Sequence, residues 1–190
     1  MNTERISLQQ IAGFCPEEAI WKMLVDVSGI LLKDGPRNVN WLHPISIVVD
    51  GDTFLVGENN SGNTEFCAPE YKEQQPLSEE QAVWTLGALI YYVSSRHIIF
   101  GGRGGEYQQK RPNVSLPALQ KTHQALTPLM HQSLCYTAKD RISLQKFNEM
   151  AQRGLKTCMN RKREKDSCEQ MLYKTESSQE HGWPEKMIEL

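Results

Sequence analysis

Histidine and cysteine are the side chains of this sequence that could ligate a metal ion or attack a substrate, and their spacing favours neither role. No two cysteines form a CxxC pair, and no group of histidines and cysteines has the spacing of a zinc site. The cysteines are Cys15, Cys67, Cys135, Cys158 and Cys168, and the histidines are His43, His97, His123, His131 and His181. No serine stands in a G-x-S-x-G elbow, which exposes a nucleophile at a sharp turn. We therefore expect no metal, no cofactor and no nucleophilic catalysis.

Composition narrows the class of protein further. The chain has 190 residues, a formal net charge of −2 and 39% hydrophobic residues, which is typical of a globular domain. Scattered, unpaired cysteines indicate reduced thiols in a cytoplasmic protein. The basic stretch Asn160–Lys165 lacks the interleaved aromatic residues that stack on bases, and the apolar run Ala82–Val93 is too short to cross a bilayer. We expect neither nucleic acid nor a membrane as partner.

Periodicity and capping signals predict a mainly helical chain with one small β-hairpin. Two strand-like runs within residues 45–56 flank Asp50-Gly51, a pair that accepts the positive φ angles of a tight hairpin turn. Ser78 and Gln81 form a capping box before an almost wholly apolar helix, which should therefore be central and buried. Helices are expected at residues 16–32, 78–93, 117–134 and 143–153.

These elements predict one domain followed by a tail. The domain should span residues 1–155, with Gly154 ending its last helix. Residues 156–190 are charged and poor in apolar side chains, which predicts a partly helical or disordered tail. The glycine run Gly101–Gly105 follows a helix rather than a strand and lacks the GxxxxGK[ST] pattern of a phosphate loop. We interpret it as a flexible connection.

Four motifs in a fixed order resemble the C-terminal lobe of a protein kinase. They are the tripeptide Ala68-Pro69-Glu70, the stretch AVWTLGALIYY with Trp84 and Gly87, the hairpin SIVVDGDTFLV, and KDRISLQKF before the last helix. In the family these correspond to the APE motif, DVWSLGVILYE, NILLDxxGxVKL and the arginine-containing entry to the final helix. The resemblance implies a mainly α kinase-like C-lobe, with one small hairpin between the first and the central helix. It covers about Ser7 to Leu155.

The resemblance also implies one structural ion pair. In kinases the glutamate of APE forms a buried pair with the arginine before the final helix, and the matching residues here are Glu70 and Arg141. Removing one partner of a buried ion pair typically costs about 3–5 kcal/mol, because the other charge stays buried without compensation.

The positions that carry phosphoryl transfer in kinases are degenerate in this chain. The reaction needs a carboxylate for the hydroxyl, a cation on the phosphates and magnesium ligands. Where an active kinase reads HRDLKPEN, this chain reads VNWLHPIS. The replacements are Trp41 for the catalytic aspartate, His43 for the lysine, Ser46 for the asparagine, Glu58 for the metal-binding aspartate after the hairpin and Ala82 for the aspartate that braces the loop. Trp41 cannot accept a proton, and His43 is mostly neutral near pH 7.

Two kinds of function follow from the resemblance. No strand-rich lobe with an ATP-pairing lysine comes before the first helix, and Ile6–Leu24 is similar to the start of KIND domains, the non-catalytic C-lobe modules. This favours a non-catalytic module that binds another protein, or a second copy of itself. Unless Met1–Cys15 folds over it, the hairpin face would expose Trp41, Leu42 and Val49 as a partner surface. The alternative is a nucleotide-binding pseudokinase, or a residual protein kinase completed by another chain.

Overall fold

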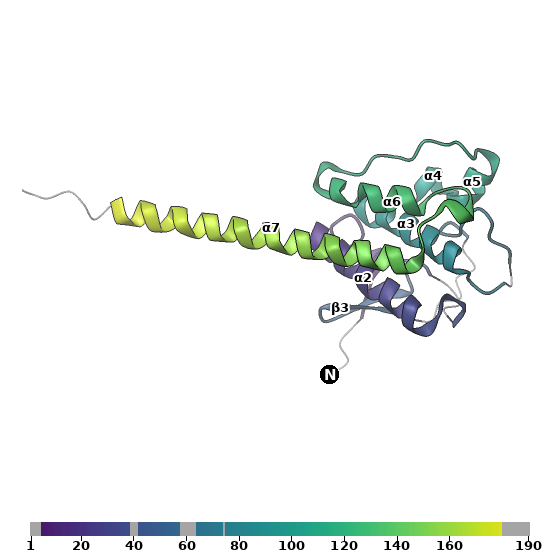
Figure 1. Ribbon diagram of the computed structural model, residues 1–190, viewed down its shortest axis with the longest axis horizontal. Coiled ribbons are helices and arrows are strands. Elements are labelled where there is room, and N and C mark those ends of the chain that lie inside the picture. Colours follow the sequence, from purple (N-terminus) through teal and green to yellow (C-terminus); the bar gives the residue numbers. More distant parts are fainter. Residues whose placement is uncertain (1–4, 39–41, 58–63, 74, 180–190) are drawn as a thin grey trace, which may run out of the picture. The chain divides into compact units, whose positions relative to one another are not determined.

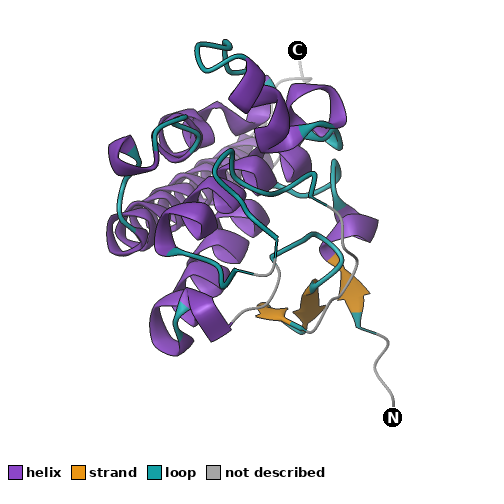
Figure 2. Cartoon of the chain, turned by 90° about the vertical axis from the view of Figure 1, so that its right-hand side faces the viewer, coloured by secondary structure: helices purple, strands orange, loops and turns teal. Residues whose placement is uncertain are grey.

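The computed structural model describes residues 5–38, 42–57, 64–73 and 75–179. The chain divides into two compact units, Met1–Leu155 and Lys156–Leu190. The first unit is mainly helical, and a small three-stranded antiparallel sheet lies beside its helices (Figure 2). Among the described helices, none is both long and apolar enough to cross a bilayer.

Helix α2 (Glu17–Asp34) forms where the sequence predicts a helix at residues 16–32. Pro16 is its N-cap, Glu17 and Glu18 stand in its first turn near the positive end of the macrodipole, and Gly35 ends it at φ 81°. Its buried stripe consists of Ile20, Trp21, Met23, Leu24, Val27 and Leu31. Helix α2 packs against β3 and α3 (Figure 1), and its buried side chains contribute much of the core.

The sheet contains the predicted hairpin and one further strand. Strands β2 (Ile47–Asp50) and β3 (Thr53–Val56) pair antiparallel around Gly51, whose φ is 60°. Strand β1 (Ile6–Ser7) pairs with β2 and places Ile6 opposite Val49. A two-residue strand has no alternation that a sequence pattern could reveal. Helix α1 (Leu8–Ile11) follows it directly, so this N-terminal segment covers one edge of the hairpin.

Helix α3 (Glu79–Ser95) is the buried central helix that the sequence predicts at residues 78–93. The hydroxyl of Ser78 accepts from the Gln81 amide at 3.2 Å, which completes the capping box. Helix α6 (Thr127–Ser133) packs on α3 at Gly87, where a Cβ atom would lie 2.8 Å from Ser133 Cβ. A glycine at this position therefore permits the close contact between the two helices.

The glycine-rich stretch is not the flexible connection that the sequence suggests. It forms the short helices α4 (Ile99–Gly102) and α5 (Gly104–Lys110). The Gly105 amide donates to the Cys67 carbonyl at 3.1 Å, and a Cβ atom on Gly105 would lie 2.5 Å from Pro69 N. The glycines allow α5 to pack backbone to backbone against the segment that carries the APE tripeptide.

Two predicted boundaries are also corrected. The helix expected at residues 117–134 is a 3-10 helix, η2 (Lys121–Leu126), followed by α6, and the residues before Lys121 are not helical. The last helix does not end at Gly154, because α7 runs from Leu144 to Gln179. Gly154 instead makes room for the Trp21 indole, whose ring atoms would lie 2.6 Å from an added Cβ. The short 3-10 helices η1 (Pro36–Asn38) and η3 (Ala138–Asp140) complete the described elements.

Candidate functional site

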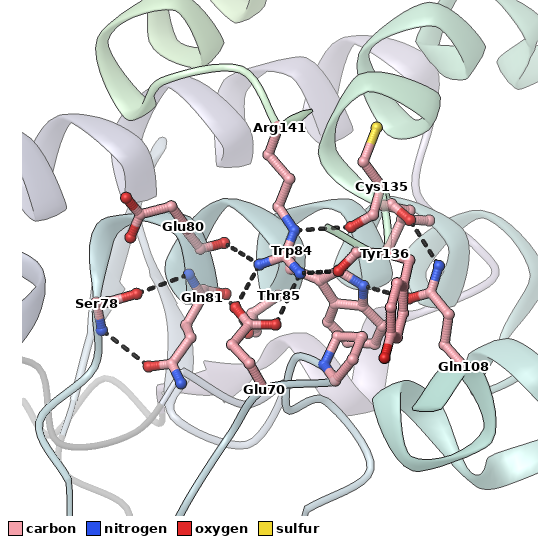
Figure 3. A network of polar contacts seen from close by, with 12 residues as sticks. Glu70, Ser78, Glu80, Gln81, Trp84, Thr85, Gln108, Cys135, Tyr136 and Arg141 are labelled. Carbon is pink, nitrogen blue, oxygen red and sulfur yellow. Dashed lines mark hydrogen bonds and ion pairs between the residues drawn. The ribbon is translucent and has the colours of Figure 1, made fainter. Parts of the chain in front are cut away.

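Arg141 lies at the centre of the polar contacts drawn in Figure 3. Its side chain has no exposed surface, and its Nη1 and Nη2 atoms donate to the two Glu70 carboxylate oxygens at 2.5 Å and 2.8 Å. The remaining donors bind the carbonyls of Cys135 at 2.8 Å, Glu80 at 2.9 Å and Tyr136 at 3.0 Å. A guanidinium carries five N–H donors, and this site provides an acceptor for every one of them.

The structure thus brings Glu70 and Arg141 together, with one correction to the expected burial. The Glu70 side chain is 36% exposed, so the pair is buried on the arginine side only. Water can reach the carboxylate, whereas the guanidinium depends entirely on protein acceptors. Removal of Arg141 should therefore reduce the stability of the fold more than removal of Glu70.

The network joins three segments that are far apart in the sequence. Ala68 is buried in the segment with Glu70, and the Glu79 carboxylate at the start of α3 accepts from the Leu144 amide at the start of α7, at 2.8 Å. Trp84 is fully buried, and its indole N–H donates to the Gln108 side chain at 2.9 Å. Pro69, also buried, accepts through its carbonyl from the side-chain Nε2 of Gln109. These contacts hold the APE segment between α3, α5 and α7.

His43 and Ser46, at the catalytic-loop positions, form a closed turn. The Ser46 hydroxyl accepts from the His43 amide at 3.1 Å and donates to the His43 carbonyl at 2.8 Å. The Ser46 amide donates to the same carbonyl at 2.9 Å. Ser46 is only 2% exposed, so its hydroxyl serves the turn and does not face solvent. The polar groups of this turn therefore bind one another.

The His43 ring is buried and uncharged. Its Nδ1 atom accepts from the Ile45 amide at 3.2 Å, which places the ring proton on Nε2. No partner for Nε2 lies among the described residues, and the ring meets Phe66 edge to face at a centroid distance of 5.0 Å. Burial lowers the pKa of His43, so the side chain provides no cation at this position.

This environment predicts a pH-dependent loss of stability. The folded-state pKa of His43 lies below its unfolded value of about 6.5, so the unfolded chain binds the proton more readily. The contribution of His43 to stability is complete above that value and falls as the pH drops towards the lowered folded pKa. In His43→Asn, an amide oxygen can replace Nδ1 as acceptor but cannot be protonated. Urea unfolding at pH 7.5 and pH 5 should show a smaller pH effect for this variant than for the wild type.

The matched control for this experiment is His97→Asn, because His97 is exposed. It makes the same change of residue type at a surface position, so a smaller pH effect in His43→Asn than in His97→Asn is due to burial at position 43. An unchanged pH effect in His43→Asn would contradict the assignment of a buried, neutral His43.

The expected partner surface on the hairpin is wrong in part. Leu42 is only 4% exposed, and Val49 is half-buried opposite Ile6 of β1. The N-terminal segment joins the sheet through β1, so the exception stated for this surface, that Met1–Cys15 folds onto the hairpin, is met in part. Ala82, at the position of the bracing aspartate, is fully buried. Trp41 and Glu58 lie outside the described residues.

Sequence reasoning missed a recess between the APE segment and α5. Its volume is about 220 Å³, and its lining includes Cys67, Ala68, Tyr71, Glu73, Glu106 and Gln109. Burial raises the pKa of the Cys67 thiol to about 12, so this cysteine stays protonated and is a poor nucleophile. No group of three or more histidine, cysteine or carboxylate side chains in the described part of the chain could hold a metal ion.

Comparisons with known proteins bear on the fold. No protein family matches the sequence, and no curated protein matches it. Among solved structures, the chain is similar to the twitchin kinase region from C. elegans, with a TM-score of 0.62 and 16% sequence identity. The match covers 76% of this chain but only 31% of the twitchin chain. At this identity the likeness concerns the fold alone, and the chain has a protein kinase-like fold that is mainly helical with a small three-stranded antiparallel sheet.

Proposed function

We propose that this chain is a non-catalytic, kinase-like module that binds another protein. The observation that carries the proposal is the closed turn of His43 and Ser46, whose polar groups bind one another while the ring stays buried and neutral. Phosphoryl transfer requires a carboxylate, a cation and metal ligands that point at the substrate. Here the Ser46 hydroxyl and His43 Nδ1 are used within the turn, and the remaining Nε2–H is a buried, neutral group that supplies no cation for phosphates.

Two further features support this reading. Ala82 provides no carboxylate at the position that braces a kinase catalytic loop, and it is fully buried in α3. In contrast, the pair of Glu70 and Arg141, which organises the kinase scaffold, is retained with every guanidinium donor bound. The chain therefore keeps the architecture of a C-lobe without the chemistry, which is the combination expected of a protein-binding module. The chain also spans less than a third of the length of the twitchin region it resembles, so that protein's activity is not carried over.

A thermal shift assay with ATP and magnesium tests the proposal against a nucleotide-binding pseudokinase. A ligand that binds the folded state stabilises it by RT ln(1 + [L]/Kd), about 2.7 kcal/mol at one hundred times Kd. We expect no change in Tm at millimolar ATP and magnesium. A shift of several degrees that disappears in Glu58→Gln, but persists in the control Glu164→Gln, would refute the non-catalytic reading.

A further inference from the structure

Phe14 is the most exposed large hydrophobic side chain in the described part of the chain. It is 77% exposed, whereas its neighbours Ala12 and Cys15 are 0% and 7% exposed. The backbone is fixed on both sides of it. The Gly13 amide donates to the Val93 carbonyl at 2.8 Å, and the Cys15 carbonyl faces His123 Nε2 at 3.2 Å. The ring is therefore held outside the core by a backbone that cannot turn it inward.

Arg96 fixes the Phe14 ring from the other side. It ends α3 in the left-handed region, at φ 61° and ψ 17°, where glycine is the usual residue. Its guanidinium lies 5.6 Å from the centre of the Phe14 ring, a cation–π contact. Gly13 leaves space for this arrangement, since a Cβ atom there would lie 3.1 Å from Arg96 Cβ. A strained, non-glycine residue at this point indicates that its side chain has a use.

Phe14 and Arg96 together form what we call the knob. It presents a rigid aromatic ring with a positive charge beside it, and the Arg96 guanidinium makes no ion pair with a described residue. Aromatic residues and arginine dominate binding energy at protein interfaces, and a side chain that is already fixed loses less entropy when it binds. The knob thus requires an apolar recess with an unpaired carboxylate at its edge.

The recess between the APE segment and α5 offers such a carboxylate, and its walls are partly apolar and partly polar. Its volume of about 220 Å³ accommodates one aromatic side chain, and Ala68, Cys67 and Tyr71 contribute to its walls. Two carboxylates line it. Glu106 is neutralised by Lys110 at 2.6 Å, whereas Glu73 makes no ion pair with a described residue. Glu73 and Tyr71 line the same recess. Burial, with smaller contributions from Cys67 and Glu73, raises the pKa of Tyr71.

We propose that the knob of one copy of this chain inserts into the recess of a second copy, with Phe14 against Tyr71 and Ala68 and Arg96 paired with Glu73. The proposal deepens the proposed function, on which it rests, by naming the partner as the chain itself. Because knob and recess are different surfaces, the contact is heterologous and can continue from copy to copy. The buried area is small, so association should be weak and visible only at high concentration.

Sedimentation analysis of the full chain tests the proposal over a range from about 10 µM to about 1 mM, where weak interfaces associate. The wild-type mass should rise with concentration beyond that of a dimer. Phe14→Ser, Arg96→Gly and Glu73→Lys should each weaken association about tenfold or more. Arg96→Gly should do so without lowering Tm, because glycine is at ease in the left-handed conformation. The control variants Ile45→Ser and Glu164→Lys should associate like the wild type.

Mixing two defective variants gives the decisive measurement. Phe14→Ser retains the recess and Glu73→Lys retains the knob, so each alone should be monomeric and their mixture should form dimers that grow no further. The proposal would be overturned by any of three results: the wild type stays monomeric, the knob and recess variants associate like the wild type, or the mixture of variants fails to dimerise. A monomeric wild type that also shows no Tm shift with ATP would leave the proposed function standing.

Discussion

Replacing Arg141 with methionine is expected to lower the free energy of unfolding by about 3–5 kcal/mol. The guanidinium has no exposed surface, and its removal leaves the carbonyls of Glu80, Cys135 and Tyr136 without their donor. A buried polar group that loses its partner costs about 1–3 kcal/mol, so several such groups at one site produce a large effect. Methionine has a similar length, which limits the contribution of an empty cavity. Urea unfolding monitored by tryptophan fluorescence measures the change.

Substitution of the ion-pair partner, Glu70→Gln, should lower the free energy of unfolding by less, about 1–2 kcal/mol. Glu70 is 36% exposed, so water can partly replace what the carboxylate offered to the arginine. Glutamine also keeps one oxygen acceptor for the guanidinium. An equal or larger loss for Glu70→Gln would contradict the view that the three carbonyls, rather than the carboxylate alone, hold Arg141. The double variant should cost less than the sum of the two single changes, because the residues share one network.

The Glu70–Arg141 pair could be predicted from the sequence for a specific reason. The two residues are 71 positions apart, and no local pattern links them. The motif context at each end supplied the link. What the motifs could not supply was the exposure of Glu70 or the identity of the other acceptors. The carbonyls of Glu80, Cys135 and Tyr136 belong to the backbone, and any residue type at these positions offers the same acceptor.

The errors at the hairpin and at the glycines share a physical cause. Val49 has a neighbour in Ile6 because β1 joins the sheet, and a two-residue strand leaves no periodic trace. Gly154 was expected to end a helix, since glycine often does so, but here it gives space to Trp21. A glycine alone does not reveal whether the chain needs its conformational freedom or its lack of a side chain. That distinction depends on a neighbour that is distant in the sequence.

The neutral state of His43 could be anticipated from its residue type, but the use of Ser46 could not. A histidine is mostly uncharged near pH 7 in any environment that does not favour its cation. Ser46, by contrast, stands at the position of the kinase asparagine, and its hydroxyl is bound to the backbone of its own turn. Short polar side chains compete for nearby backbone groups, and only the local geometry decides which group they bind.

Replacing Gly105 with alanine should lower the free energy of unfolding by about 3 kcal/mol, although alanine is normally favoured within a helix. The added methyl group would lie 2.5 Å from Pro69 N and from the Ala68 carbonyl carbon, and closer still to the Cys67 carbonyl oxygen. All three atoms belong to the backbone, so no side-chain rotation can relieve the contact. Gly101→Ala is the matched control. It has open space around it and a φ of +66°, so it carries only the conformational cost, about 1–2 kcal/mol.

The two glycines should differ most clearly in their coupling to Arg141. The methyl group on Gly105 must displace the APE segment, which moves Glu70 away from the guanidinium and disturbs the network before Arg141 is changed. Combining Gly105→Ala with Arg141→Met should therefore cost at least about 1 kcal/mol less than the sum of the single changes, whereas Gly101→Ala with Arg141→Met should be additive within about 0.5 kcal/mol. Additivity in both double variants would mean that α5 does not position the APE segment. Gly105 would then matter for the packing of α5 alone.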